Sequence, residues 1–356
     1  MSKRALVPPH KSRSERPSPT PREIFGYLDE YVVGQERAKR AVAIAAYNHV
    51  KRCAQPKDKR IIKKSNLLLI GPTGCGKTHI ARNLAECLKV PFIVADATEY
   101  TEAGYYGKDV EVMVAELLFK SGHSIEDTQR GIVFIDEIDK IARRSQGARN
   151  GAGSRDIGGE GVQQALLKLL EGRELFVPLN VTQHWNKHDF VQVDTSDILF
   201  IAAGTFSDLS MYGDGVEKQI GMLGGSATEK KQKRVAANEL TEYGMLPELL
   251  GRLPVIVQLD PLDEGQLVDV LSGPPDSIVR EYQALFAADD IKLELTDGAL
   301  REIVRFAVAR RVGARGLRGI VEEVCHDLMF EAPERRGETV KVDAAHVRER
   351  LAEVER

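Results

Sequence analysis

The chain has 356 residues, of which 42% are hydrophobic and 29% charged, and its formal net charge is −3. This slightly acidic balance argues against a surface built to bind nucleic acid. The sequence contains neither a run of about 18 apolar residues nor an apolar signal core after Met1, which argues against a membrane span. The four cysteines form no C-x-x-C pair, so we interpret them as reduced thiols and expect a cytoplasmic protein.

The first 20 residues predict a disordered basic tail. Up to Arg22 the sequence carries six basic residues and five prolines against one acid, Glu15. Such a segment buries too little apolar surface to offset its ordering entropy. An organelle transit peptide is the alternative interpretation, but the tail lacks an amphipathic apolar face.

Two helices are predicted next. Thr20 and Glu23 form a capping-box pair at the start of the first helix. The stretch Val32-Val33-Gly34-Gln35 ends that helix, and a second one begins at Glu36. Residues 53–64 are polar and basic, and we expect a loop there.

A glycine-rich turn follows the apolar run 67–70 and precedes a helical pattern. This order of strand, turn and helix gives the motif G-x-x-x-x-G-K-[ST] the context of a P-loop. Backbone amides of such a turn surround phosphate oxygens, Lys77 reaches the terminal phosphates, and the Thr78 hydroxyl ligates Mg²⁺. The sequence therefore predicts a nucleoside triphosphate and Mg²⁺ bound at Gly71, Pro72, Thr73, Gly74, Cys75, Gly76, Lys77, Thr78 and His79.

Further apolar runs are typical of buried parallel strands, at residues 91–97, 131–137, 197–204 and 254–259. Strands that alternate with helical stretches predict an α/β fold, in which helices flank a parallel sheet. Beyond 261 the pattern becomes mostly helical, with one strand-like stretch at 291–295. We therefore expect the tail at 1–20, a large domain at 21–262 and a smaller α+β domain at 263–356.

Two adjacent acids end the run at 131–137. In a P-loop fold Asp136 can hold the Mg²⁺ shell beside Thr78, and Glu137 can act as general base toward a water that attacks the γ-phosphate. The same pair could be a solvated strand end, but the P-loop favours hydrolysis. Hydrolysis also needs donors that stabilise charge on the γ-phosphate, and the candidates are Arg252 and Arg315.

These residues together resemble the AAA+ ATPases, and within them the ClpX family of protein unfoldases. The resemblance runs from about Thr20 to near the C-terminus and is carried by motifs at 28–35, 71–78, 95–98, 101–107, 136–140, 159–168, 251–254 and 313–318. It implies a homo-hexameric ring that hydrolyses ATP with Mg²⁺, with one nucleotide at each subunit junction.

The resemblance also implies roles within the ATP site. Val32 and Val33 would line the adenine pocket. Arg252 looks like an arginine finger, supplied in trans to the neighbour's ATP, and Arg315 looks like the sensor-2 arginine. Thr205 occupies the sensor-1 place, where AAA+ proteins often carry a polar residue.

Protein substrates are implied by a segment that resembles the family's pore-1 loop, Gly104-Tyr105-Tyr106-Gly107. In that loop an aromatic ring grips an unfolded or tagged polypeptide without reading its sequence. Tyr105 has the gripping position with Tyr106 beside it, and Arg155 matches the pore-2 region. A tyrosine pair buried in a turn is the alternative interpretation.

Some positions depart from the family's pattern. The docking loop for a Clp-type peptidase corresponds to Ile220, Gly221 and Met222, where methionine replaces the usual phenylalanine. No counterpart of the family's zinc domain precedes Thr20, and the pore-mouth segment at 183–188 lacks the usual Arg-Lys-His. The resemblance thus favours an unfoldase that delivers proteins to a peptidase. The alternatives are a free-standing protein remodeller and a nucleic-acid motor, and the aromatic pore loop argues against the motor.

Cys75 within the P-loop suggests one further hypothesis. The helix N-terminus and Lys77 would lower the pKa of its thiol, so that oxidation blocks nucleotide binding. The alternative is an unreactive side chain that fills the loop.

Overall fold

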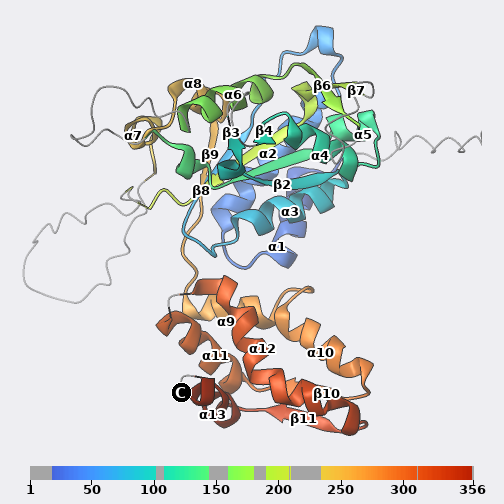
Figure 1. Cartoon of the computed structure of the whole chain (residues 1–356), viewed down its shortest axis with the longest axis vertical. Coiled ribbons are helices and arrows are strands. Elements are labelled where there is room, and N and C mark those ends of the chain that lie inside the picture. The colour runs from blue at the N-terminus through green and yellow to red at the C-terminus, as the bar shows by residue number, and fades with distance from the viewer. Residues whose placement is uncertain are drawn as a thin grey trace, which may run out of the picture.

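A five-stranded parallel sheet organises the first part of the chain (Figure 1). The structure is a computed structural model and describes residues 18–101, 108–143, 159–179, 190–207, 209, 234–310 and 312–354. The strand order is β2-β5-β8-β1-β9. Each strand lies within an apolar run predicted from the sequence, which confirms the α/β expectation. The strands span Phe92–Asp96 (β2), Ile132–Asp136 (β5), Leu199–Gly204 (β8), Leu67–Ile70 (β1) and Val255–Gln258 (β9).

The two faces of the sheet bury alternate residues of each strand. On β1, Leu67 and Leu69 pack into one core, Leu68 and Ile70 pack into the other, and all four are fully buried. A strand that is buried on both faces has a continuous apolar sequence, which explains the pattern. The first core lies under α1 (Pro21–Tyr31), α2 (Glu36–Cys53) and α3 (Lys77–Leu88). The second lies under α4 (Val112–Lys120), α6 (Gly159–Glu171), α7 (Ala237–Tyr243) and α8 (Pro247–Arg252).

The predicted capping box at the start of α1 is confirmed. The backbone amide of Thr20 donates to the Glu23 carboxylate at 2.7 Å, and the amide of Glu23 donates to Thr20 Oγ1 at 3.3 Å. These bonds satisfy amides that a helix leaves unpaired at its first turn.

Two small strand pairs lie beside the sheet. β3 (Tyr100–Thr101) and β4 (Lys108–Asp109) are parallel, whereas β6 (Glu174–Pro178) and β7 (Phe190–Asp194) are antiparallel. The sequence analysis predicts neither pair, because β3 and β4 have only two residues each, and β6 and β7 are not continuous buried runs. The remaining short helices here are η1 (Lys57–Lys59), η2 (Ala97–Glu99), α5 (Ile125–Gln129), η3 (Ile138–Ile141) and η4 (Thr195–Asp197).

The chain after β9 forms a smaller, mainly helical domain with its own core (Figure 1). The predicted strand at 291–295 is present as β10 (Lys292–Leu295) and pairs in parallel with β11 (Thr339–Val342). The helices are α9 (Glu264–Ser272), α10 (Ile278–Ala288), α11 (Asp297–Ala309), α12 (Gly313–Glu331), η5 (Ala332–Glu334) and α13 (Ala344–Val354). Across the residues that the structure describes, no helix combines the length and apolar character of a membrane span.

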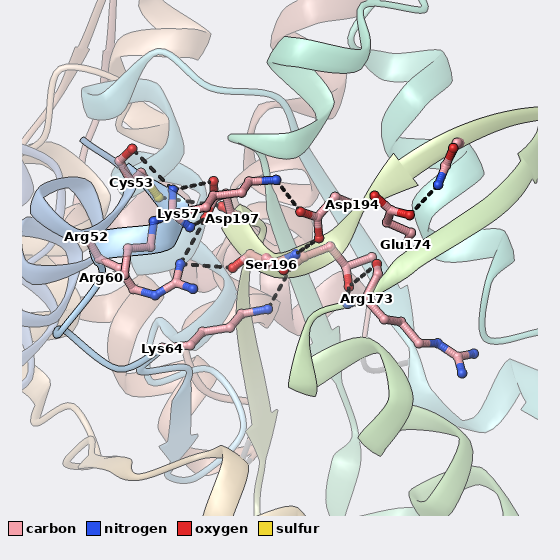
Figure 2. Close-up of polar contacts among 12 residues, drawn as sticks. Arg52, Cys53, Lys57, Arg60, Lys64, Arg173, Glu174, Asp194, Ser196 and Asp197 are labelled. Atoms are coloured by element: carbon pink, nitrogen blue, oxygen red, sulfur yellow. Dashed lines mark hydrogen bonds and ion pairs between the residues drawn. The ribbon is translucent and has the colours of Figure 1, made fainter. Parts of the chain in front are cut away.

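A cluster of charged side chains ties the end of α2 to the start of β8 (Figure 2). Arg52 donates to the Asp197 carboxylate at 2.9 Å, and Arg60 donates to the same carboxylate at 2.5 and 2.9 Å. Lys64 donates to the backbone carbonyl of Thr195 at 2.8 Å. Because both guanidinium groups are largely buried, this cluster anchors the edge of the sheet at which β8 begins.

His49 is buried close to this cluster. Burial, together with the charges of Lys64 and Arg52, lowers the pKa of His49 to about 4. Burial likewise lowers the pKa of Lys64 to about 7. Burial therefore disfavours the charged form of both groups. Unfolding between about pH 4 and pH 6.5 takes up a proton at His49, whereas Lys64 takes one up on unfolding only above about pH 7.

We predict that stability falls as the pH drops from about 6.5 to about 4, because unfolded His49 binds a proton that the folded form excludes. A pKa shift of this size corresponds to at most roughly 3 kcal/mol of unfolding free energy. His49→Gln removes the titrating group, so its urea midpoint should vary less with pH over this range than that of the wild type. Equal pH dependence of the two proteins would contradict the assignment.

Candidate nucleotide-binding site

The P-loop joins the end of β1 to the first turn of α3. Gly74 and Gly76 adopt left-handed conformations, with φ of 80° and 98°, that residues with a side chain seldom adopt. Lys77 donates to the backbone carbonyls of Gly71 and Pro72, at 2.7 and 2.9 Å. The ammonium group is therefore held inside the loop, and burial there lowers the pKa of Lys77.

The first of the two acids predicted at the end of a strand, Asp136, lies against the P-loop helix. The Thr78 hydroxyl donates to Asp136 at 3.4 Å, and Asp136 in turn accepts the backbone amide of Glu137 at 2.9 Å. Glu137 adopts a left-handed conformation, with φ of 55°, and its side chain is exposed. The structure thus brings the Thr78 hydroxyl beside the Asp136 carboxylate, with the exposed carboxylate of Glu137 on the next residue.

The oxygens of Thr78 and Asp136 fit one Mg²⁺ ion, which prefers oxygen ligands and retains several waters. Within the described part of the chain, no group of three or more His, Cys, Asp or Glu side chains is arranged to hold a metal ion. A Mg²⁺ ion at this position would therefore take further ligands from phosphate oxygens and water.

The end of β8 brings Thr205 to the same edge of the sheet. Gly204, the last residue of β8, lies opposite Ile70 of β1, and its carbonyl accepts the backbone amide of Gly71 at 3.2 Å. The next residue, Thr205, donates its hydroxyl to the Asp139 carboxylate at 2.9 Å. The sensor-1 candidate thus lies beside the P-loop, and it has a partner to which the sequence analysis assigns no role.

The turn between α1 and α2 contacts the P-loop through Gln35, which is 8% exposed. Its side-chain amide donates to the backbone carbonyls of Cys75, at 3.3 Å, and Asp260, at 2.7 Å. It also accepts the backbone amide of Asp260 at 3.0 Å. Since Asp260 lies between β9 and α9, one side chain connects the turn, the P-loop and the segment that leads into the C-terminal domain. The motif at 32–35 includes Gln35 but does not reveal this role.

The adenine-pocket candidates Val32 and Val33 lie in the same turn. Val32 is buried, and its carbonyl accepts a hydrogen bond from Lys39 at 3.1 Å. His79, in the first turn of α3, lies 3.1 Å from the carbonyl of Tyr31 through its Nε2 atom. The contact between Tyr31 and His79 places the start of this turn beside α3, the helix that follows the P-loop.

Arg315 approaches the P-loop from the C-terminal domain. It lies in the first turn of α12 and is exposed. A Cβ atom on Gly74 would lie 3.7 Å from its backbone nitrogen and 3.3 Å from that of Ala314. Burial is the main cause of the lowered pKa of Lys77, and the charge of Arg315 adds to it. The structure therefore brings the sensor-2 candidate to the predicted site.

Arg252 lies at a different edge. It ends α8, and its carbonyl accepts a hydrogen bond from the Asn66 side chain at 2.9 Å. Asn66 immediately precedes β1, so Arg252 lies at the edge of the sheet opposite the P-loop of its own chain. Its guanidinium pairs with Glu171 at 2.8 Å, with the two side chains 52% and 50% exposed.

For Cys75, the hypothesis of a lowered pKa is contradicted, and the alternative of an unreactive side chain that fills the loop is supported. The side chain is 2% exposed and packs into the core that lies under α1, α2 and α3. Burial raises the pKa of this thiol, although the charge of Lys77 opposes the change. A buried thiol with a raised pKa is poorly reactive, so the hypothesis of a redox-sensitive P-loop is not supported.

The remaining candidates lie outside the described residues. These are Tyr105, Tyr106 and Arg155 of the pore loops and Ile220, Gly221 and Met222 of the docking loop. The flanks of the first segment, β3 and β4, pair with each other. At the flanks of the second, Gly159 is so close to Ile141 that a Cβ atom would lie 2.6 Å from its carbonyl oxygen. The described fold thus fixes the flanks of both segments that the sequence analysis compares with pore loops.

Known proteins match nearly the whole chain. Residues 62–256 match the AAA domain (Cdc48 subfamily), and residues 262–347 match the C-terminal, D2-small domain of ClpB protein. The chain is 46% identical over 318 residues to the ATP-dependent Clp protease ATP-binding subunit ClpX 2 of Wolinella succinogenes, an alignment that covers 89% of this chain and 79% of the relative. It is 42% identical over 349 residues to the subunit ClpX of Porphyromonas gingivalis, with coverage of 94% and 82%. The identity to the subunit ClpX of Treponema denticola is 43% over 332 residues, with coverage of 90% and 79%.

We predict that Gln35→Glu weakens nucleotide binding about tenfold, or by about 1.4 kcal/mol. The substitution keeps the size of the side chain but sets a carboxylate against the carbonyls of Cys75 and Asp260. Titration calorimetry with ADP measures the effect. Gln129→Glu, on α5, is the matched control and should leave the affinity unchanged. A wild-type affinity in Gln35→Glu would show that this contact does not support the site.

Proposed function

The chain belongs to the ClpX family of AAA+ ATPases, and from this premise we propose that it forms a ring hexamer that pulls proteins through a central channel. The observation that carries the proposal is the meeting of the P-loop, the two acids and Thr205 at one edge of the sheet. This arrangement of residues occurs in a chain that aligns with proteins named ClpX over 89–94% of its length.

We assign ATP to the P-loop, with its adenine beside Val32 and Val33. Lys77 contacts the terminal phosphates, and Mg²⁺ held by Thr78 and Asp136 neutralises phosphate charge when it is bound. The exposed Glu137 carboxylate accepts a proton from the water that attacks the γ-phosphate. Hydrolysis then releases ADP and inorganic phosphate.

In the proposed ring, each site is divided between two subunits. We assign residues 21–262 to a large domain and residues 263–356 to a small domain, which supplies Arg315 to the ATP of its own chain. Arg252 lies opposite its own P-loop, and this position supports a role in trans, at the ATP of the neighbour. An exposed ion pair such as Arg252–Glu171 contributes at most about 1 kcal/mol, so the guanidinium can exchange this partner for a phosphate at little cost.

Contact with the protein substrate is assigned to Tyr105, Tyr106 and Arg155, on segments whose flanks the fold fixes. Aromatic rings provide apolar grip on a polypeptide of any sequence. Delivery to a Clp-type peptidase would use Ile220, Gly221 and Met222. A free-standing remodeller is the second candidate, because the flexible Met222 side chain lacks the ring contacts of phenylalanine.

Tyr105→Ala should retain ATP hydrolysis within about twofold, because the residue is not part of the ATP site, but should reduce protein unfolding at least about tenfold. The measurements are ATP turnover and the loss of fluorescence of a tagged fluorescent protein. Tyr105→Phe keeps the ring and should unfold the same substrate at nearly the wild-type rate. Undiminished unfolding by Tyr105→Ala would exclude this residue from the grip.

Glu137→Gln should bind ATP and fail to hydrolyse it, and should therefore retain its protein partners. An affinity purification with ATP, followed by mass spectrometry, identifies them. Lys77→Ala, which should not hold ATP, is the control for proteins that bind independently of nucleotide. A peptidase retained only by Glu137→Gln supports delivery to proteolysis, whereas substrates without a peptidase support the remodeller.

A further inference from the structure

Asp139 is a buried carboxylate outside the ATP-site residues assigned above. It is 5% exposed and lies in η3, two residues after Glu137. Its Oδ2 atom accepts the Thr205 hydroxyl at 2.9 Å and the backbone amide of Phe206 at 3.3 Å, and its Oδ1 atom accepts the backbone amide of Thr205 at 3.3 Å. All three donors come from the segment that follows β8.

The packing around this carboxylate is tight. A Cβ atom on Gly204 would lie 2.8 Å from Asp139 Oδ1 and 2.6 Å from the ring of Phe206. The same glycine accepts the first amide of the P-loop through its carbonyl. Asp139 and Thr205 are therefore held within the structure that links β1, β5 and β8, immediately beside the acid that we assign as general base.

The chemistry of a carboxylate fixes the direction of its bond to Thr205. An ionised carboxylate only accepts hydrogen bonds, so the Thr205 hydroxyl must donate its single proton to Asp139. Its oxygen is then left with two acceptor positions. Ser207, whose hydroxyl lies 3.4 Å away, can donate to one of them, and a water can donate to the other. While this bond persists, Thr205 cannot donate to a phosphate oxygen.

We propose that Asp139 is a positioning residue for ATP hydrolysis, which holds the Thr205 hydroxyl as an acceptor for the attacking water. The inference rests on the proposed role of Glu137. The water directs one proton to Glu137 and the other to Thr205, and these two bonds aim its lone pair at the γ-phosphorus. As the new P–O bond forms and the bond to ADP breaks, Glu137 takes the first proton, and the second stays on the inorganic phosphate.

The test inverts the polarity of this contact. Asp139→Asn keeps the shape but has one acceptor oxygen instead of two. With that oxygen on the Thr205 amide, the NH₂ group faces the Thr205 hydroxyl and the Phe206 amide, and the hydroxyl is no longer held as an acceptor toward the water. We expect kcat for ATP hydrolysis to fall about tenfold, with KM and the dissociation constant for ATP within about twofold of wild type. Thr205→Val, which removes the hydroxyl, should give the same loss, whereas Thr205→Ser should restore most of the activity.

The double variant separates positioning from a structural role. If Asp139 acts through Thr205, then Asp139→Asn combined with Thr205→Val loses no more activity than either single variant. Independent losses that multiply would overturn the proposal, as would a wild-type kcat in Thr205→Val. The threonine variants keep the test decisive if Asp139→Asn folds poorly, which the urea midpoint reports.

The assay uses ATP turnover without protein substrate, so a failure of the threading proposal would not affect it. Glu137→Gln is measured in parallel. Hydrolysis that persists in Glu137→Gln would remove the general base on which the inference rests. Loss of hydrolysis there, with wild-type turnover in Asp139→Asn and Thr205→Val, would overturn the inference alone.

Discussion

The edge at which the parallel strands β1, β5 and β8 end is the constraint on which the rest of the structure depends. The strands run in one direction and in register, so the residues that follow them meet although they are far apart in sequence. The P-loop amides follow β1, Asp136 ends β5 with Glu137 directly after it, and the Thr205 hydroxyl follows β8. One residue earlier the side chains belong to the apolar cores, so the chemistry begins where each strand stops.

The opposite edge of the sheet carries charges of another kind. Arg52 and Arg60 are largely buried and share the Asp197 carboxylate, a pairing that adds little net stability but is costly to break. At the nucleotide edge, Glu137 and Arg315 are exposed. Buried guanidinium groups therefore hold the start of β8, whereas exposed Glu137 and Arg315 lie at the edge where β8 ends.

The sequence predicts the sheet, the P-loop and the paired acids because continuous apolar runs and glycine spacing are local properties. It does not predict contacts that depend on burial or on distant partners. Gln35 bonds to Asp260, which is 225 residues away. Asp139 differs from Asp136 and Glu137 in that its carboxylate is buried and accepts three hydrogen bonds from Thr205 and Phe206. For Cys75, the local argument from Lys77 gives the wrong direction, because burial beneath the loop outweighs that charge.

Through Asn66, β1 is connected to Arg252 as well as to the P-loop. The strand has four residues, which span about 13 Å at the usual rise of about 3.3 Å per residue. One end opens into the loop assigned to this subunit's ATP, and the other end, through Asn66, holds the carbonyl of Arg252, assigned to the neighbour's ATP. In the proposed ring this short, fully buried strand is a rigid spacer between two nucleotides. A displacement of β1 at one nucleotide would then also move the backbone that carries Arg252.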